Sequence, residues 1–173
     1  VVHKVEIQSE HWQHQQVTLY IVITHHRVGG QITSEAHIFV SSDMLHDTFF
    51  VQHAMKELRA HFQRRGLTFA RWFINTDGAA SHFKNRFTFQ SMFNFKASGK
   101  HTSVTWETCA PGHGKGPWDG IGAVVKRLIR LLETNGKVYA QGPFSVFKIL
   151  LEHQETWLKE IKSKVKIDGF FYH

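Results

Sequence analysis

Hydrophobic residues follow two different patterns along this chain of 173 residues, and their order restricts the fold. Residues 16–25 are rich in Val, Ile, Thr and Tyr, which predicts a buried strand. A turn at Val28-Gly29-Gly30 leads into a second strand over residues 34–41, and strand-like and helix-like segments alternate from there. Antiparallel strands followed by strand–helix alternation are typical of a mixed sheet with helices packed on its faces. We therefore expect an α/β fold.

Spacing and capping residues predict the elements that follow these two strands. Val51, Met55, Leu58 and Phe62 recur at the spacing of one helix face. The expected elements are a helix opening near residues 42–47 and ending at 64–66, a strand over 69–76, a helix over about 80–95, a strand over 102–109, a helix over about 118–135, a helix from 143 to about 163, and a short strand within 165–172.

The remaining composition fits one globular domain over residues 1–173. Hydrophobic residues make up 42% and charged residues 20% of the chain, which is the balance of a chain with a packed core. Residues 136–173 either complete that core or form an accessory C-terminal helix and tail. No apolar run approaches the roughly 20 residues that cross a bilayer, and the first residues do not resemble a signal peptide. The single cysteine, Cys109, favours a reducing location inside the cell, including the nucleus.

The charge balance points to a polyanionic partner. Lysine and arginine number 21 against 14 aspartates and glutamates, which gives a net charge of +7 and a pI near 9.7. Nucleic acid is the first expectation, an anionic membrane surface the second, and a basic protein without such a partner remains an alternative. The 15 phenylalanines are mostly expected in the core, but exposed ones beside basic residues could stack on bases.

Asp77 is the strongest single candidate for chemistry. It directly follows the strand predicted over residues 69–76 and precedes Gly78. Ligand-binding residues gather at the carboxyl ends of strands in open α/β sheets. A carboxylate at such an end is held by rigid backbone and is still open to solvent, as a metal ligand must be. Because Asp-Gly is also a common turn pair, a turn or helix-capping role is the alternative.

A glycine-rich segment over residues 112–120 is the second candidate. Its glycines let the backbone approach a phosphate closely, while His113 and Lys115 can supply charge and Asp119 opens the following helix. The spacing differs from that of a phosphate-binding P-loop, and no Ser or Thr follows Lys115, so we reject that motif. The alternative is a flexible surface loop in front of a helix-capping aspartate.

Asp77 and Asp119 together suggest phosphoryl transfer. This chemistry uses carboxylates from separate elements to hold two divalent ions about 3.5–4 Å apart. Basic residues follow each aspartate and would flank a phosphate backbone, unless they only form solvated helix faces. They are Lys84, Arg86, Lys126, Arg127 and Arg130.

Other clusters have simpler explanations. Two aspartates and a histidine within residues 42–47 stand at a helix start, where capping accounts for them. A zinc site from Cys109 and His113 lacks a paired CxxC or HxxxH partner. His25-His26 indicates the end of a strand more than a pair of ligands.

Five short segments of the chain form a recognisable set. They are EIQSEHW and QVTL (residues 6–12 and 16–19), SDMLHD (42–47), TDGAASHFKN (76–85) and HGKGPWDGIG (113–122). As a set and in this order they resemble a family of transposon-derived eukaryotic proteins with an RNase H-like core. The resemblance implies an RNase H-like mixed sheet with one more strand ahead of residue 1, and a DDE/D-type core that binds Mg²⁺ or Mn²⁺ and cuts or joins DNA. By that resemblance Asp77 is the second metal-binding acid and Asp119 the third.

The chain departs from that family in lacking, after Val1, the acidic segment that lies just upstream of Glu6 in its members. It is then either a piece of a longer protein or a line that has lost its first acid. Three functions stay open. The first is a metal-dependent nuclease or transposase core in which His113 and Lys115 contact the scissile phosphate. The second is a domain that binds DNA or RNA without cutting, and the third is a self-associating module that uses residues 83–95.

Overall fold

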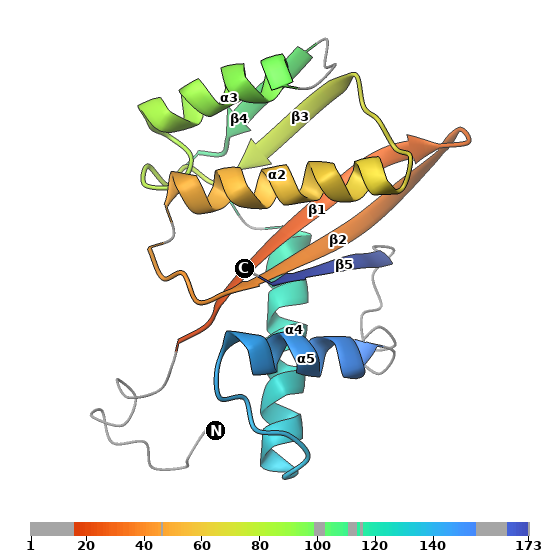
Figure 1. Ribbon diagram of the computed structural model, residues 1–173, viewed down its shortest axis with the longest axis vertical. Coiled ribbons are helices and arrows are strands. Elements are labelled where there is room, and N and C mark those ends of the chain that lie inside the picture. The colour runs from red at the N-terminus through yellow and green to blue at the C-terminus, as the bar shows by residue number, and fades with distance from the viewer. Residues whose placement is uncertain are drawn as a thin grey trace. The chain divides into compact units, whose positions relative to one another are not determined.

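A computed structural model describes residues 16–45, 47–98, 103–110, 114, 116–154 and 166–172 (Figure 1). The chain divides into two compact units, and each is described by itself. The hairpin unit comprises Val1–Met44 with Gly116–His173, and the basic unit comprises Leu45–Lys115. The expected mixed α/β class is confirmed. The elements are β1 (Thr18–Val28), β2 (Gln31–Ser41), α2 (Thr48–Arg64), β3 (Arg71–Thr76), α3 (Arg86–Ser98), β4 (Ser103–Thr108), α4 (Pro117–Thr134), α5 (Pro143–Glu152) and β5 (Lys166–Tyr172).

The hairpin unit is built on a three-stranded sheet in the order β1-β2-β5. β1 and β2 pair antiparallel along their whole length, from Thr18 opposite Ser41 to Val28 opposite Gln31. The two residues between them, Gly29 and Gly30, have φ values of 57° and 85°, a left-handed turn that glycine adopts without strain. β5 joins the free edge of β2 in parallel. The predicted hairpin is therefore confirmed, and the C-terminal strand completes its sheet.

Two helices supply the core of the hairpin unit. The stripe of α4 buries Ile121, Val125, Leu128 and Leu132, which recur every three or four residues. These side chains pack with alternate residues of β2 and with one face of α5, so residues beyond 136 complete the core. The core residues of β2 and α5 are Ala36, Ile38, Val40, Val146, Ile149 and Leu150.

The basic unit has a mixed interior, since among its described residues three buried phenylalanines lie with four buried non-aromatic apolar side chains. β3 and β4 form a two-stranded parallel sheet, against which α2 and α3 pack. Trp72 of β3 meets the rings of Phe62, Phe69 and Phe95 edge-on, with centroids 5.2–6.2 Å apart. Such edge-to-face pairs add roughly 0.5–1.5 kcal/mol each beyond the area that they bury.

The sheet and one helix differ from expectation. Instead of one mixed sheet there are two, since no strand in the described ranges pairs with the second edge of β1 or of β3. The helix predicted from residue 80 begins at Arg86, because the side chain of Asn85 caps it there and residues 77–85 form turns. The continuation of the last helix, predicted over residues 155–163, lies outside the described residues. Among the described helices, none has the length and apolar character to cross a membrane.

Candidate functional site

Asp77 stands one residue beyond the end of β3, exposed to solvent. Its Oδ1 accepts a hydrogen bond of 3.1 Å from the backbone N–H of Ala79, which forms a local turn and fixes the carboxylate. β4 runs parallel to β3 and ends beside it, where the N–H of Cys109 donates to the carbonyl of Thr76 at 2.8 Å. The carboxyl ends of both strands therefore lie at the same edge, as the sequence predicted for Asp77.

The glycine-rich segment touches Asp77 through its backbone. A Cβ atom built on Gly114 would lie 2.9 Å from the Cβ of Asp77, closer than real Cβ contacts allow. Gly78 is similarly close-packed, since a Cβ there would lie 3.0 Å from the carbonyl oxygen of Cys109. Two of the segments singled out from the sequence are thus brought together at Gly114. His113 and Lys115, on either side of it, lie outside the described residues.

A polar network holds the turns that follow Asp77. The side-chain oxygen of Asn85 accepts from the N–H groups of Phe87 and Thr88, both at 3.0 Å, and caps α3. Its amide nitrogen donates to the Thr48 hydroxyl at 2.5 Å and to the Ala80 carbonyl at 2.8 Å. The Thr48 hydroxyl donates in turn to carbonyls within residues 77–85. Asn85 therefore orders the segment that carries Asp77, a role that the sequence analysis missed although Asn is a common capping residue.

Asp119 has the geometry of a helix-start residue. Its Oδ2 accepts from the N–H of Gly116 at 2.9 Å, and its own N–H donates to the Gly116 carbonyl at 3.1 Å. A negative charge in the first turn is also favoured by the helix dipole. Gly116 is required for space, because a Cβ there would overlap the ring of Trp118. Asp119 belongs to the hairpin unit, whereas Asp77 belongs to the basic unit.

The described residues do not make a metal centre on their own. No three His, Cys, Asp or Glu side chains within the described ranges are grouped so that they could hold an ion. Catalytic zinc is held by three protein ligands, whereas Mg²⁺ is usually held by one or two carboxylates together with water and substrate phosphates. Asp77 and Asp119 each keep a second carboxylate oxygen that accepts no hydrogen bond from the described residues, but further ligands would be needed. Cys109 donates to Asn75 Oδ1 at 3.2 Å, a contact that does not involve a metal.

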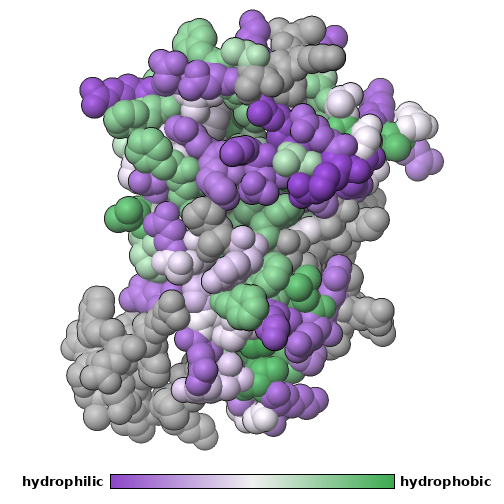
Figure 2. All heavy atoms as spheres, viewed as in Figure 1, coloured by the Kyte–Doolittle hydropathy of each residue, from purple (hydrophilic) through white to green (hydrophobic). Residues whose placement is uncertain are grey.

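Positive charge is concentrated in the basic unit. Residues 45–115 contain ten lysines and arginines against four aspartates and glutamates, and so hold six of the chain's seven net charges. Figure 2 shows hydrophilic side chains gathered over α2, which contributes several of them. Lys84 and Arg86 are exposed, and the Arg86 guanidinium lies 4.8 Å from the centroid of the Phe87 ring.

The basic residues predicted on the hairpin unit are also exposed. Lys126, Arg127 and Arg130 alternate along α4 with the buried core positions, and so occupy the solvent face of the helix. Their exposure fits both interpretations of the sequence, an ordinary solvated helix face and a surface that binds a polyanion.

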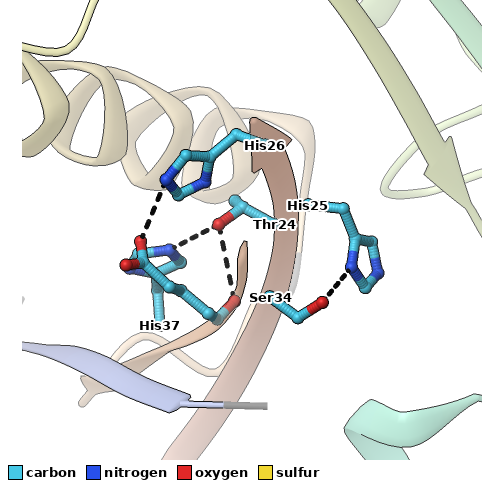
Figure 3. Close-up of polar contacts among 6 residues, drawn as sticks. Thr24, His25, His26, Ser34 and His37 are labelled. Carbon is cyan, nitrogen blue, oxygen red and sulfur yellow. Dashed lines mark hydrogen bonds and ion pairs between the residues drawn. The ribbon is translucent and has the colours of Figure 1, made fainter. Parts of the chain in front are cut away.

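A buried polar cluster on β1 and β2 was not predicted (Figure 3). Glu35 and His37 are 2% and 0% exposed. Nε2 of His26 lies 3.8 Å from Oε2 of Glu35, and Nε2 of His37 lies 2.9 Å from the Thr24 hydroxyl. These residues share the sheet face opposite the aliphatic core, because the strand register places them in alternation with it. The neighbouring His25 points the other way, to Ser34, so His25-His26 is not a pair of ligands.

No curated protein and no solved structure matches this chain. A family model described as "Domain of unknown function (DUF8701)" matches residues 1–167. The chain therefore belongs to the DUF8701 family.

Proposed function

We propose that the chain is a nucleic-acid-binding domain of the RNase H-like transposase type, in which Asp77 is the acid next to the bound phosphodiester. The observation that carries this proposal is the position of Asp77. It is an exposed carboxylate at a strand end, touched by the backbone of Gly114, in the unit that holds six of seven net charges. Fixed strand ends supply functional side chains in α/β proteins, and positive charge supplies the affinity for phosphates.

The order of elements supports the RNase H-like part of the proposal. An antiparallel pair, β1 and β2, comes first, and a β3–α3–β4 unit with parallel strands follows. The resemblance implies one further strand ahead of this pair. The second edge of β1 and that of β3 have no partner strand in the described part of the chain, so either edge can accept such a strand.

Exposed aromatic rings favour single-stranded nucleic acid as a ligand in addition to the duplex. Phe89 and Phe93 stand one helical turn apart on α3 and are 58% and 72% exposed. α3 carries no acidic residue, and Arg86 and Lys96 lie near its two ends. A base stacked on such a ring gains roughly 1–3 kcal/mol, and the basic residues hold its phosphates.

Metal-dependent strand cleavage is a second candidate function, favoured by the same placement of Asp77. A divalent ion bound there would stabilise charge on a phosphate oxygen. Because no group of three His, Cys, Asp or Glu side chains that could hold an ion is found among the described residues, we assign binding first and cleavage second.

Labelled DNA tests both functions in one experiment. The protein is titrated into a fluorescent duplex and its single strand in chelator, at about 50 mM and 200 mM salt, where phosphate binding should weaken steeply. Binding that is absent at low salt, or insensitive to salt, would contradict the proposal. The same DNA is then incubated with Mn²⁺ and wild type or Asp77→Asn. Cutting by the wild type alone would establish the second function, and no cutting by either would leave binding as the function.

A further inference from the structure

A groove in the basic unit lies apart from Asp77. It runs between α2 and α3, has a volume of about 200 Å³, and is floored by Trp106 of β4. Every residue that lines it lies within the basic unit. A groove of this size is below the roughly 300–1,000 Å³ of sites for drug-sized ligands, so it suits a single ring or a group of similar size.

The lining follows helix periodicity. From α2 come Gln52, Met55, Lys56 and Arg59, at the spacing of a single helix face. From α3 the groove receives a serine, an asparagine and Phe95 at the same kind of spacing. Two cations, neutral hydrogen-bonding groups and apolar surface thus meet, and none of the described residues that line the groove is a carboxylate. This combination selects an anion that also carries a flat apolar part.

Several of these groups are held in place without a ligand. The guanidinium of Arg59 lies 4.8 Å from the centroid of the Phe95 ring, and its Nη1 donates to the Phe95 carbonyl at 3.3 Å. The Trp106 indole nitrogen donates to the Thr76 hydroxyl at 3.1 Å, which fixes the floor. Lys56 is exposed beside them. A ligand would therefore meet an ordered cation and an ordered aromatic surface, which lowers the entropic cost of binding.

We propose that this groove binds one phosphorylated nucleoside, with the base against Met55 and Trp106 and the phosphate at Lys56 and Arg59. A base fits the volume, while the sugar and phosphate extend toward the exposed Lys56 and the half-buried Arg59. Two ligands have this chemistry: a free mononucleotide, and an unpaired nucleotide within a nucleic-acid strand. Only binding of the strand nucleotide rests on the proposed function.

The test uses adenosine 5′-monophosphate, inorganic phosphate and adenosine as separate probes, with binding followed by calorimetry and tryptophan fluorescence. The monophosphate should bind saturably and more tightly than either part. Lys56→Gln should weaken it roughly tenfold, the usual effect of losing one charge-assisted hydrogen bond. Arg64→Gln removes the same charge from an exposed position of α2 outside the groove, and should leave affinity within about twofold. Arg59→Lys keeps the charge and should reduce affinity because lysine lacks the planar fork of arginine.

Several results would overturn the inference. If inorganic phosphate binds as tightly as the nucleotide, the groove does not recognise the base. If Lys56→Gln and Arg64→Gln lose affinity equally, binding depends on the general positive charge and not on this groove. A glutamate-rich peptide that displaces the nucleotide at equal concentration would assign the groove to acidic protein segments instead.

Competition with an oligonucleotide identifies the source. Displacement of the monophosphate by a single strand supports a strand nucleotide, and binding of the monophosphate without such displacement supports a free nucleotide. Loss of strand binding with intact monophosphate binding would contradict the proposed function and leave this inference standing.

Discussion

The two units of this protein differ in what fills them and in what they present to solvent. The hairpin unit is filled by aliphatic side chains from β2, α4 and α5 and is nearly neutral, with eleven lysines and arginines against ten aspartates and glutamates. The described core of the basic unit combines aromatic with non-aromatic apolar side chains, and this unit carries most of the net charge. It also holds the exposed strand end with Asp77 and the groove between α2 and α3.

From this difference we infer that the hairpin unit supplies most of the stability and that the basic unit supplies most of the ligand-binding surface. Burying a large aliphatic side chain contributes about 1.5–3 kcal/mol, so the core residues of the hairpin unit offset part of the conformational entropy that is lost on folding. The basic unit leaves Phe73 77% exposed and Phe93 72% exposed, which costs stability unless a partner covers them. We therefore expect core changes to act mainly through the hairpin unit and surface changes to act mainly through the basic unit.

The largest effect should come from the core of the hairpin unit. Leu128→Ala empties a position that is 4% exposed and should cost about 2–5 kcal/mol of unfolding free energy, because burial is reduced and a cavity remains. Leu131→Ala, three residues along α4 at 42% exposure, is the matched control and should cost less than about 1 kcal/mol. Urea unfolding measures both. Equal losses of stability would mean that the aliphatic core does not dominate it.

The network around Asn85 should give the next largest effect, this time in the basic unit. Asn85→Ala removes the α3 cap and the amide donors to Thr48 and Ala80, and should cost about 2–3 kcal/mol. Asn85→Asp keeps the capping oxygen, so it should retain α3 while losing those donors. Hydrogen exchange across residues 77–88 distinguishes the two. Unchanged protection in Asn85→Ala would show that the turns after Asp77 are held by other interactions.

Removing charge from each unit in turn should then show which unit contributes more to nucleic-acid binding. Lys84→Gln with Arg86→Gln changes the basic unit, and Lys126→Gln with Arg127→Gln makes the same change of charge on α4. The salt dependence of DNA binding, the slope of log K against log salt, should become shallower by about 0.9 for every phosphate that a variant no longer neutralises. The first pair should reduce affinity more, because it stands in the stronger positive field. A larger reduction in the second pair would assign the nucleic-acid surface to the hairpin unit.

The sequence predicted local features well and long-range ones less well. The end of β3 directly before Asp77 and the apolar stripe of α4 depend on spacing within one segment, and both are confirmed. The predicted start of α3 was wrong because Asn85, which lies inside the predicted helix, caps it so that it begins at Arg86; the bond from Asn85 to Thr48, 37 positions away, supports that cap. The cluster of Glu35 and His37 was missed because only the register of β1 against β2 brings their partners beside them. The groove needs two helices packed together, which no single segment encodes.

The smallest stability effect should separate the two aspartates that the sequence singled out. Asp119→Asn weakens the carboxylate contact to the N–H of Gly116 and the favourable charge at the start of α4, and should cost about 0.3–1 kcal/mol. Asp77→Asn changes an exposed carboxylate whose amide oxygen can still accept from Ala79, and so should leave the unfolding free energy within about 0.5 kcal/mol. Thermal unfolding of both variants measures this difference. If Asp77→Asn instead stabilises the protein, the carboxylate is kept at a cost to stability, as expected of a group retained for a ligand. A cost for Asp77→Asn equal to that for Asp119→Asn would indicate that Asp77 has only a turn-forming role.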